Sequence, residues 1–100
     1  MNAAVQIEPH RLEDLCRRWK IQELALFGSV ARGEFAPESD VDILVTFEAD
    51  APWTLWDLSR LRQEMRDLFG RNVDLVEQNG LRNPFLRQEI LSTKQVIYAA

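Results

Sequence analysis

The chain has 100 residues, a hydrophobic fraction of 46%, a charged fraction of 28% and a formal net charge of −4. These are the proportions of one ordinary globular domain, expected over residues 1–100. The acidic balance argues against direct nucleic-acid binding, which usually needs a clustered basic face. No apolar run approaches the about 20 residues of a membrane span, so no membrane contact is expected.

The first predicted helix covers residues 9–20, because its apolar residues recur at the spacing of one helical face. They are Leu12, Leu15, Cys16 and Trp19. Cys16 is the single cysteine, so it excludes an internal disulfide and fits a reducing cytoplasm. Its place on the apolar face predicts a buried structural thiol. His10, the single histidine, is expected in solvent rather than at a site.

Two strands with a turn-rich segment between them are predicted next. The first covers residues 21–27 and stops at Gly28-Ser29, after which residues 30–32 suit a short helical turn. The second strand is expected over residues 39–47 with alternating faces. One of these faces carries Asp40, Asp42, Leu44 and Thr46.

The second half of the chain predicts a long helix over residues 54–69, begun by Thr54 as a cap and ended by Gly70. Its apolar residues are expected to pack on the sheet, and they are Leu55, Leu58, Leu61, Met65, Leu68 and Phe69. Trp53 and Trp56 are expected to contribute to the core rather than to a partner surface.

A third strand is predicted over residues 73–77, and Asp74 lies near its start. A turn follows at 78–80, and a last helix begins at Pro84 with Asn83 as its cap. Its expected inward residues are Leu86, Ile90 and Leu91, and residues 95–98 suit an edge strand. Alternating helices and strands predict an α/β layer architecture.

The two acids of the second strand carry the clearest chemical signal. Asp40 and Asp42 leave the same strand face, with Cα atoms roughly 6–7 Å apart. At about 4 Å and an effective dielectric near 20, two such charges repel by on the order of 4 kcal/mol, so a proton or a cation is expected between them. Oxygen ligands suit Mg²⁺, with Mn²⁺ as the alternative. Asp74 would be a third acid, either for a second metal ion or to deprotonate an attacking hydroxyl.

The segment after the first strand suits a phosphate group. Gly28 lets the backbone approach a ligand closely, and Ser29 opens a helical turn whose N–H groups can bind an anion. Arg32, one turn later, could reach the same phosphate; the alternative for Arg32 is a structural salt bridge with Glu34 or Glu38. Each motif alone is common, but together they predict a metal-dependent nucleoside triphosphate site.

The string Gly28-Ser29, ten residues, then Asp40-Val41-Asp42 resembles the signature of the nucleotidyltransferase superfamily with a polymerase-beta-like palm. The fuller string, Gly-Ser-x-Ala-Arg-Gly-Glu followed by Ser-Asp-x-Asp-Ile-Leu-Val, is similar to the minimal nucleotidyltransferase (MNT) antitoxins. The resemblance covers nearly the whole chain and implies a nucleotidyltransferase fold, a small mixed β-sheet packed with helices. It implies that Gly28, Ser29 and Arg32 bind the nucleotide, and that Asp40, Asp42 and Asp74 are catalytic metal ligands.

The resemblance also implies a substrate and a partner. In characterised members the antitoxin transfers AMP from ATP, with Mg²⁺, to a tyrosine of a HEPN-domain ribonuclease toxin. The toxin carries an Arg-x4-6-His-x-Tyr motif, which this chain lacks. Three hypotheses follow: an AMP-transferring antitoxin, an antitoxin that neutralises its toxin by binding and occlusion, and a small-molecule transferase. The intact acids favour the first, and the length disfavours the third because no acceptor domain is visible.

Overall fold

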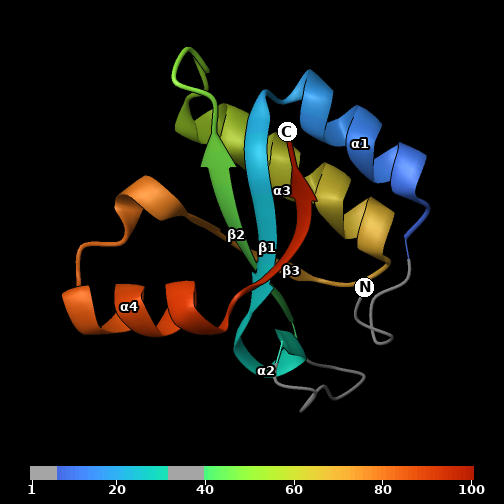
Figure 1. Ribbon diagram of the computed structural model, residues 1–100. Coiled ribbons are helices and arrows are strands. Elements are labelled where there is room, and N and C mark those ends of the chain that lie inside the picture. The colour runs from blue at the N-terminus through green and yellow to red at the C-terminus, as the bar shows by residue number, and fades with distance from the viewer. Residues whose placement is uncertain (1–6, 32–39) are drawn as a thin grey trace.

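The computed structural model describes residues 7–31 and 40–100 (Figure 1). Each helix begins and ends where local residue chemistry favours it: Pro9 and Pro84 stand in first turns, and Gly70 ends the long helix with a φ of 72°. The elements are α1 (Pro9–Arg18), β1 (Ile21–Phe27), α2 (Gly28–Ala31), β2 (Val41–Phe47), α3 (Leu55–Phe69), β3 (Val73–Glu77), the 3-10 turn η1 (Gln78–Gly80), α4 (Pro84–Thr93) and β4 (Gln95–Ala99).

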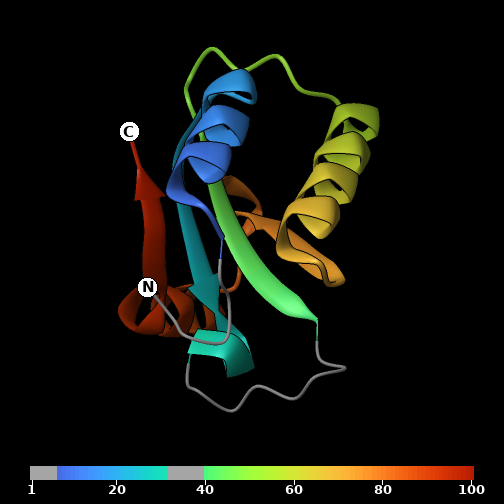
Figure 2. The same cartoon turned by 90° about the vertical axis from the view of Figure 1, so that its right-hand side faces the viewer.

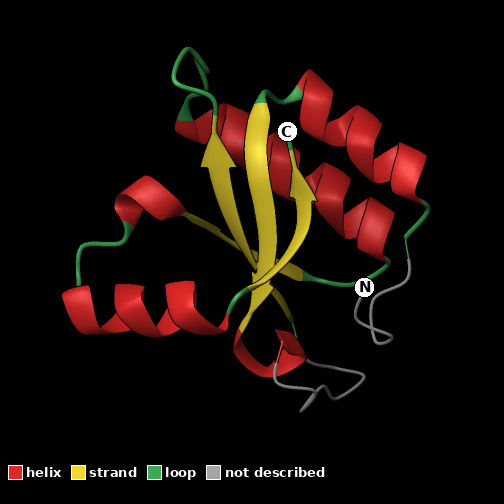
Figure 3. Cartoon of the chain, viewed as in Figure 1, coloured by secondary structure: helices red, strands yellow, loops and turns green. Residues whose placement is uncertain are grey.

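The four strands form one mixed sheet in the order β3-β2-β1-β4 (Figure 3). β1 pairs antiparallel with both β2 and β4, whereas β2 and β3 are parallel. The parallel pair requires a crossover, and α3 supplies it. The predicted α/β architecture with a small mixed sheet is confirmed.

One face of the sheet carries the larger core, under α1 and α3. Figure 2 shows these two helices together on one side of the strands. Strand residues such as Leu24, Ile43 and Val73 pack here against Leu61 and Met65 of α3, all of them fully or almost fully buried. Each such side chain contributes about 1.5–3 kcal/mol when removed from water. Cys16 is also wholly buried on this face, and burial raises the pKa of its thiol to about 12. The prediction of a structural thiol is confirmed.

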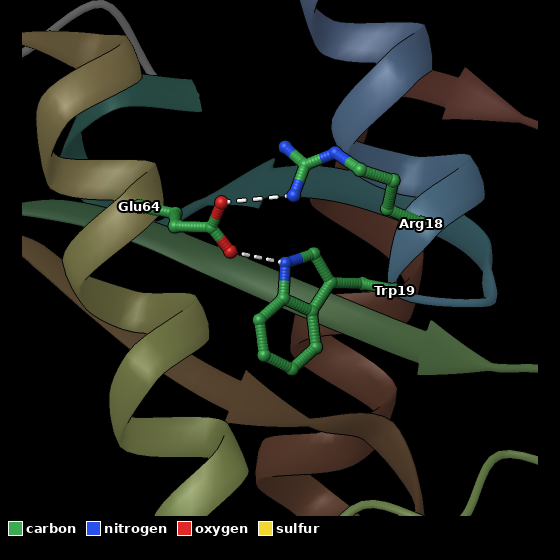
Figure 4. A network of polar contacts seen from close by, with 3 residues as sticks. All are labelled: Arg18, Trp19 and Glu64. Atoms are coloured by element: carbon green, nitrogen blue, oxygen red, sulfur yellow. Dashed lines mark hydrogen bonds and ion pairs between the residues drawn. The ribbon is translucent and has the colours of Figure 1, made fainter.

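A polar contact joins α1 to α3 at the rim of this core (Figure 4). The indole Nε1–H of Trp19 donates to Glu64, and Arg18 Nη1 donates to the other carboxylate oxygen of Glu64 at 3.0 Å. Trp53 packs close by, with its ring centroid 4.8 Å from that of Trp19, and donates through Nε1 to the Trp19 carbonyl at 2.7 Å. The predicted core role of Trp53 is therefore confirmed.

The opposite face of the sheet is covered by α4. No other described helix of more than one turn packs there. The buried cluster on this face consists of Ala25 of β1, Leu44 of β2 and Ile90 of α4. Lys94, just after α4, forms an ion pair with Glu23 of β1 that fixes the helix end to the sheet. This face therefore has a small core and leaves one end of the sheet accessible.

Several predicted details are wrong. Leu55 and Trp56 lie in the first turn of α3 with 83% of each residue exposed, and Leu86 is 47% exposed rather than turned inward. At 3.6 residues per turn, Trp56 lies about 140° around the α3 axis from the buried Leu61, so its side chain faces away from the core. Two predicted boundaries also differ: α1 ends at Arg18 rather than at residue 20, and β2 begins at Val41 rather than at residue 39. No helix among the described residues is long and apolar enough to span a membrane.

Candidate active site

The pairing of β2 with β3 brings two predicted acids together. Asp42 and Asp74 are register partners in this parallel pair, so their Cα atoms lie about 4.8 Å apart and both side chains leave the same sheet face. Their neighbours Leu44 and Val76 pack in the cluster under α4. The two carboxylates thus lie on the α4 face of the sheet, at the end from which β2 and β3 begin.

Asp40 lies immediately before β2 and is exposed, as Asp74 is, whereas Asp42 is half-buried. The N–H of Val41 donates to the carbonyl of Asn72 at 2.9 Å, which fixes the start of β2 beside the start of β3. All three predicted acids therefore come from the same end of the sheet. Asp40 was expected on the strand, but it belongs to the segment that leads into it.

Gly28 contacts Asp42 from the neighbouring strand. Asp42 pairs with Phe27, the last residue of β1, so the chain turns into α2 directly beside the carboxylate. Gly28 has a φ of 69°, and a Cβ there would lie 2.3 Å from Asp42 Oδ2. Only glycine leaves room for that carboxylate and adopts this backbone conformation without strain.

The remaining predicted nucleotide-binding residues are described only in part. Ser29 lies in the one-turn helix α2, and the structure describes its backbone but not its side chain. Arg32 lies outside the described residues. The predicted helical turn is confirmed, with α2 beginning at Gly28, two residues earlier than expected.

Asp40, Asp42 and Asp74 offer carboxylate oxygens, the kind of donor that Mg²⁺ prefers. No three carboxylate, histidine or cysteine side chains in residues 7–31 and 40–100 lie close enough together to hold a metal ion by themselves. Mg²⁺ does not require such a cage, because it usually takes one or two carboxylates together with water and substrate phosphate oxygens. The adjacent Asp42 and Asp74, with Asp40 exposed nearby, supply donors of that kind.

A cleft on the other face of the sheet is lined by none of these acids. Its volume is about 580 Å³, and it lies between α1 and β4 with residues such as Leu12, Leu26 and Tyr98 in its walls. The cleft is mainly apolar and joins the larger core. The converging acids, rather than the depth of a cleft, therefore define the candidate active site.

The sequence pattern indicates phosphate binding for Gly28 and does not predict its contact with Asp42. The spacing of Gly28 and Asp42 in the sequence could not reveal this contact, because it does not determine how the two strands pair. The signal that could have found it is the order of the segments, since one strand ends at Gly28 and the next begins close to Asp42. Two seven-residue strands in an antiparallel pair bring the end of the first beside the start of the second.

Known proteins share the sequence pattern and the fold of this chain. The family model described as nucleotidyltransferase domain matches residues 11–97. The protein adenylyltransferase MntA of Thermococcus cleftensis is 35% identical over 86 residues, which are 86% of this chain and 82% of MntA. A crystal structure of a toxin–antitoxin with AMP-PNP is 25% identical and has a TM-score of 0.75, over 94% of this chain and 75% of that chain.

A third comparison concerns the fold alone. One chain in a solved structure is similar to this chain, with a TM-score of 0.65 and 23% identity. That structure is a tri-AMPylated HEPN toxin of Shewanella oneidensis in complex with an MNT antitoxin. The match covers 92% of this chain and 70% of that chain.

The chain belongs to the nucleotidyltransferase domain family, and it has the fold of that family. Its enzyme class is that of a nucleotidyltransferase. Within the family, the resemblance to the minimal nucleotidyltransferase antitoxins that its sequence motifs indicate is confirmed.

Proposed function

We propose that this chain is the antitoxin of a HEPN/MNT toxin–antitoxin pair, and that it transfers AMP from ATP to a tyrosine hydroxyl of its ribonuclease toxin. The observation that carries the proposal is the register pairing of Asp42 with Asp74 beside Gly28. The adenylyltransferase name of MntA and the AMP-PNP in a similar toxin–antitoxin structure support it.

In the proposed reaction, the tyrosine oxygen attacks the α-phosphorus of ATP. A new phosphorus–oxygen bond forms as the bond to the β-phosphate bridge breaks, and pyrophosphate leaves. The hydroxyl proton passes to a carboxylate, and we assign this role to Asp74, which is exposed and therefore within reach of an acceptor. Gly28 and Ser29 would hold the phosphates, and Arg32 would neutralise part of their charge.

Asp42, with Asp40 and Asp74, would hold one or two Mg²⁺ ions, with Mn²⁺ as an alternative. When bound, such ions stabilise the entering and leaving oxygens of a phosphoryl transfer. The half-buried position of Asp42 suits this role, because a carboxylate held against Gly28 loses little freedom on binding a cation. We place the reaction in the cytoplasm, the compartment that the single buried thiol favours.

The consequence for the toxin follows from charge. AMP attached to an active-site tyrosine would add a phosphate where the ribonuclease must bind an RNA backbone. Both repulsion and bulk would then oppose cleavage of the RNA. Neutralisation by binding and occlusion is the alternative, and it needs no nucleotide transfer.

The test is the intact mass of the HEPN ribonuclease encoded beside this chain, after incubation with the protein, ATP and Mg²⁺. We expect mass increments of one or more AMP groups with wild type and with Asp67→Asn, a matched change on the exposed surface of α3. Asp42→Asn is expected to bind the ribonuclease without modifying it, and to leave cells unprotected. If Asp42→Asn protects cells as well as wild type and no AMP is found, occlusion is the function.

A further inference from the structure

α4 is the least buried long element of the described structure. Within Pro84–Thr93, only Ile90 is buried and Leu91 is half-buried, while every other residue is exposed. An isolated helix of about ten residues is marginal in water, and most helices gain their stability by packing an apolar face. The single buried anchor of α4 leaves most of its surface available to another molecule.

Large apolar side chains lie on this exposed surface. Phe85 is 84% exposed and Leu86 is 47% exposed, both in the first helical turn. The side chain of Asn83 accepts hydrogen bonds from the N–H groups of Phe85 and Leu86, at 3.0 and 3.2 Å. The cap holds this turn in helical form before any partner arrives, which reduces the entropy lost on binding.

A groove lined by two arginines lies beside α4, and neither Phe85 nor Leu86 lines it, whereas the exposed acid Glu89 follows Phe85 by one helical turn. Arg82 and Arg87 border this open groove of about 550 Å³, and neither forms an ion pair with any residue that the structure describes. Complementarity therefore calls for a partner that offers carboxylates to this groove and an apolar contact to the first turn of α4.

The position of α4 relates it to the candidate active site. Ile90 packs on Ala25 and Leu44, and Leu44 leaves the same face of β2 as Asp42. α1 and α3 cover the other face, as Figure 2 shows. A protein seated on α4 would therefore lie on the face from which the two paired carboxylates are reached.

We propose that the first turn of α4 and the groove beside it form the docking surface for the acceptor protein, with Phe85 and Leu86 in apolar contact and with Arg82 and Arg87 meeting carboxylates on another side of the helix. This α4 surface is an inference that rests on the proposed function, because its occupant is the acceptor of that reaction. A second copy of the chain fits less well, since a two-fold contact through α4 would bring arginines of both copies together.

The experiment compares two double variants that each remove two exposed apolar side chains. Phe85→Ser with Leu86→Ser alters the α4 surface, and Leu55→Ser with Trp56→Ser is the matched control in the first turn of α3. Affinity for the HEPN ribonuclease encoded beside this chain is measured by calorimetry. We expect the α4 variant to bind at least about 30-fold more weakly and the control to stay within about twofold of wild type.

Two further readouts separate docking from the reaction itself. The rise in melting temperature with ATP and Mg²⁺ should be the same in both variants, and AMP transfer by the α4 variant should recover at saturating ribonuclease, as a raised KM with unchanged kcat. Charge is tested with Arg82→Glu and Arg87→Glu, which should slow association most at low salt.

Equal affinity of the α4 variant and wild type would overturn the α4 surface while leaving AMP transfer as the function. Loss of affinity in the α3 control alone would overturn it as well, and would place docking at α3. A wild-type dimer that the α4 variant converts to monomer, without change in ribonuclease affinity, would assign the surface to a second copy. Failure of wild type to bind the ribonuclease at all would contradict the proposed function and the docking together.

Discussion

The Cβ of any residue other than glycine at position 28 would lie 2.3 Å from Oδ2 of Asp42, a separation that side chains do not tolerate. The end of β1 and the start of β2 are therefore closely fitted around one carboxylate. The left-handed backbone of Gly28 turns the chain into α2 at the same point. The loop expected to hold phosphate and the acid expected to hold metal form one packed unit.

Replacing Gly28 by alanine should displace the Asp42 carboxylate and also strain the backbone. Gly70→Ala is the matched control, because Gly70 has a φ of 72° but no atom within 4 Å of its Cβ position. Both variants should lose about 1–2 kcal/mol of unfolding free energy from the left-handed conformation. Gly28→Ala alone should also lose the stabilisation by ATP with Mg²⁺ in thermal melts. Equal nucleotide responses in the two variants would mean that Asp42 has no part in binding.

The paired acids predict a specific form of ligand stabilisation. ATP together with Mg²⁺ should raise the melting temperature more than the sum of either alone, because a ligand bound only by the folded state stabilises it. Asp42→Asn and Asp74→Asn should each abolish that synergy and keep the secondary structure seen by circular dichroism. Asp67→Asn on α3 should keep both. Retention of synergy in both site variants would place the metal elsewhere.

The buried Cys16 predicts a dependence of stability on alkaline pH. The folded pKa of its thiol is raised by burial from 9.0 to about 12, so the unfolded chain loses the proton first as pH rises. Its contribution to stability is complete below pH 9.0 and is lost between that pH and about pH 12. The difference in unfolding free energy between wild type and Cys16→Ala should therefore shrink over this window, as urea titrations can measure. A difference that stays constant would contradict the burial of the thiol.

In native protein at neutral pH, Cys16 should also react slowly with a thiol reagent, since the thiolate is the reactive form and the side chain is wholly buried. The rate should rise to that of a free thiol once urea unfolds the chain. Rapid labelling without urea would show that α1 opens readily from the sheet.

The contact of Trp19 and Arg18 with Glu64 predicts an order of stabilities. Glu64→Ala leaves the indole N–H of the buried Trp19 without an acceptor, which should cost about 1–3 kcal/mol of unfolding free energy. Arg18→Ala removes only a partly exposed ion pair and should cost at most about 1 kcal/mol. Urea unfolding followed by tryptophan fluorescence measures both losses. An equal or larger loss for Arg18→Ala would show that the ion pair, rather than the indole, joins the helices.

Local signals in the sequence predicted most of the element boundaries. Thr54 caps α3 as expected and forms a capping box with Asp57, Asn83 caps α4, and Gly70 ends α3 in the left-handed conformation. These features depend on residues within a few positions of one another, so their chemistry is visible in the chain itself. The strand over Ile21–Phe27 was predicted for a similar reason, as a short apolar run between two breaks.

The burial of residues at the ends of helices was decided by the tertiary structure. Leu55 and Leu86 continue apolar patterns, yet Leu55 is 83% exposed and Leu86 is 47% exposed. Helical periodicity indicates which side of a helix faces the core. It carries no information on how far the core extends.

The sequence by itself determined the chemical kinds of residue at the candidate active site: a glycine–serine turn, the acids Asp40 and Asp42, and a further acid near a strand start. Only the tertiary structure decided that Asp74 stands beside Asp42 and that Gly28 packs against the same carboxylate. The physical reason is the range of the interactions. Capping and alternation act between neighbours in the chain, whereas strand order and register are set by the packing of the whole sheet against its helices.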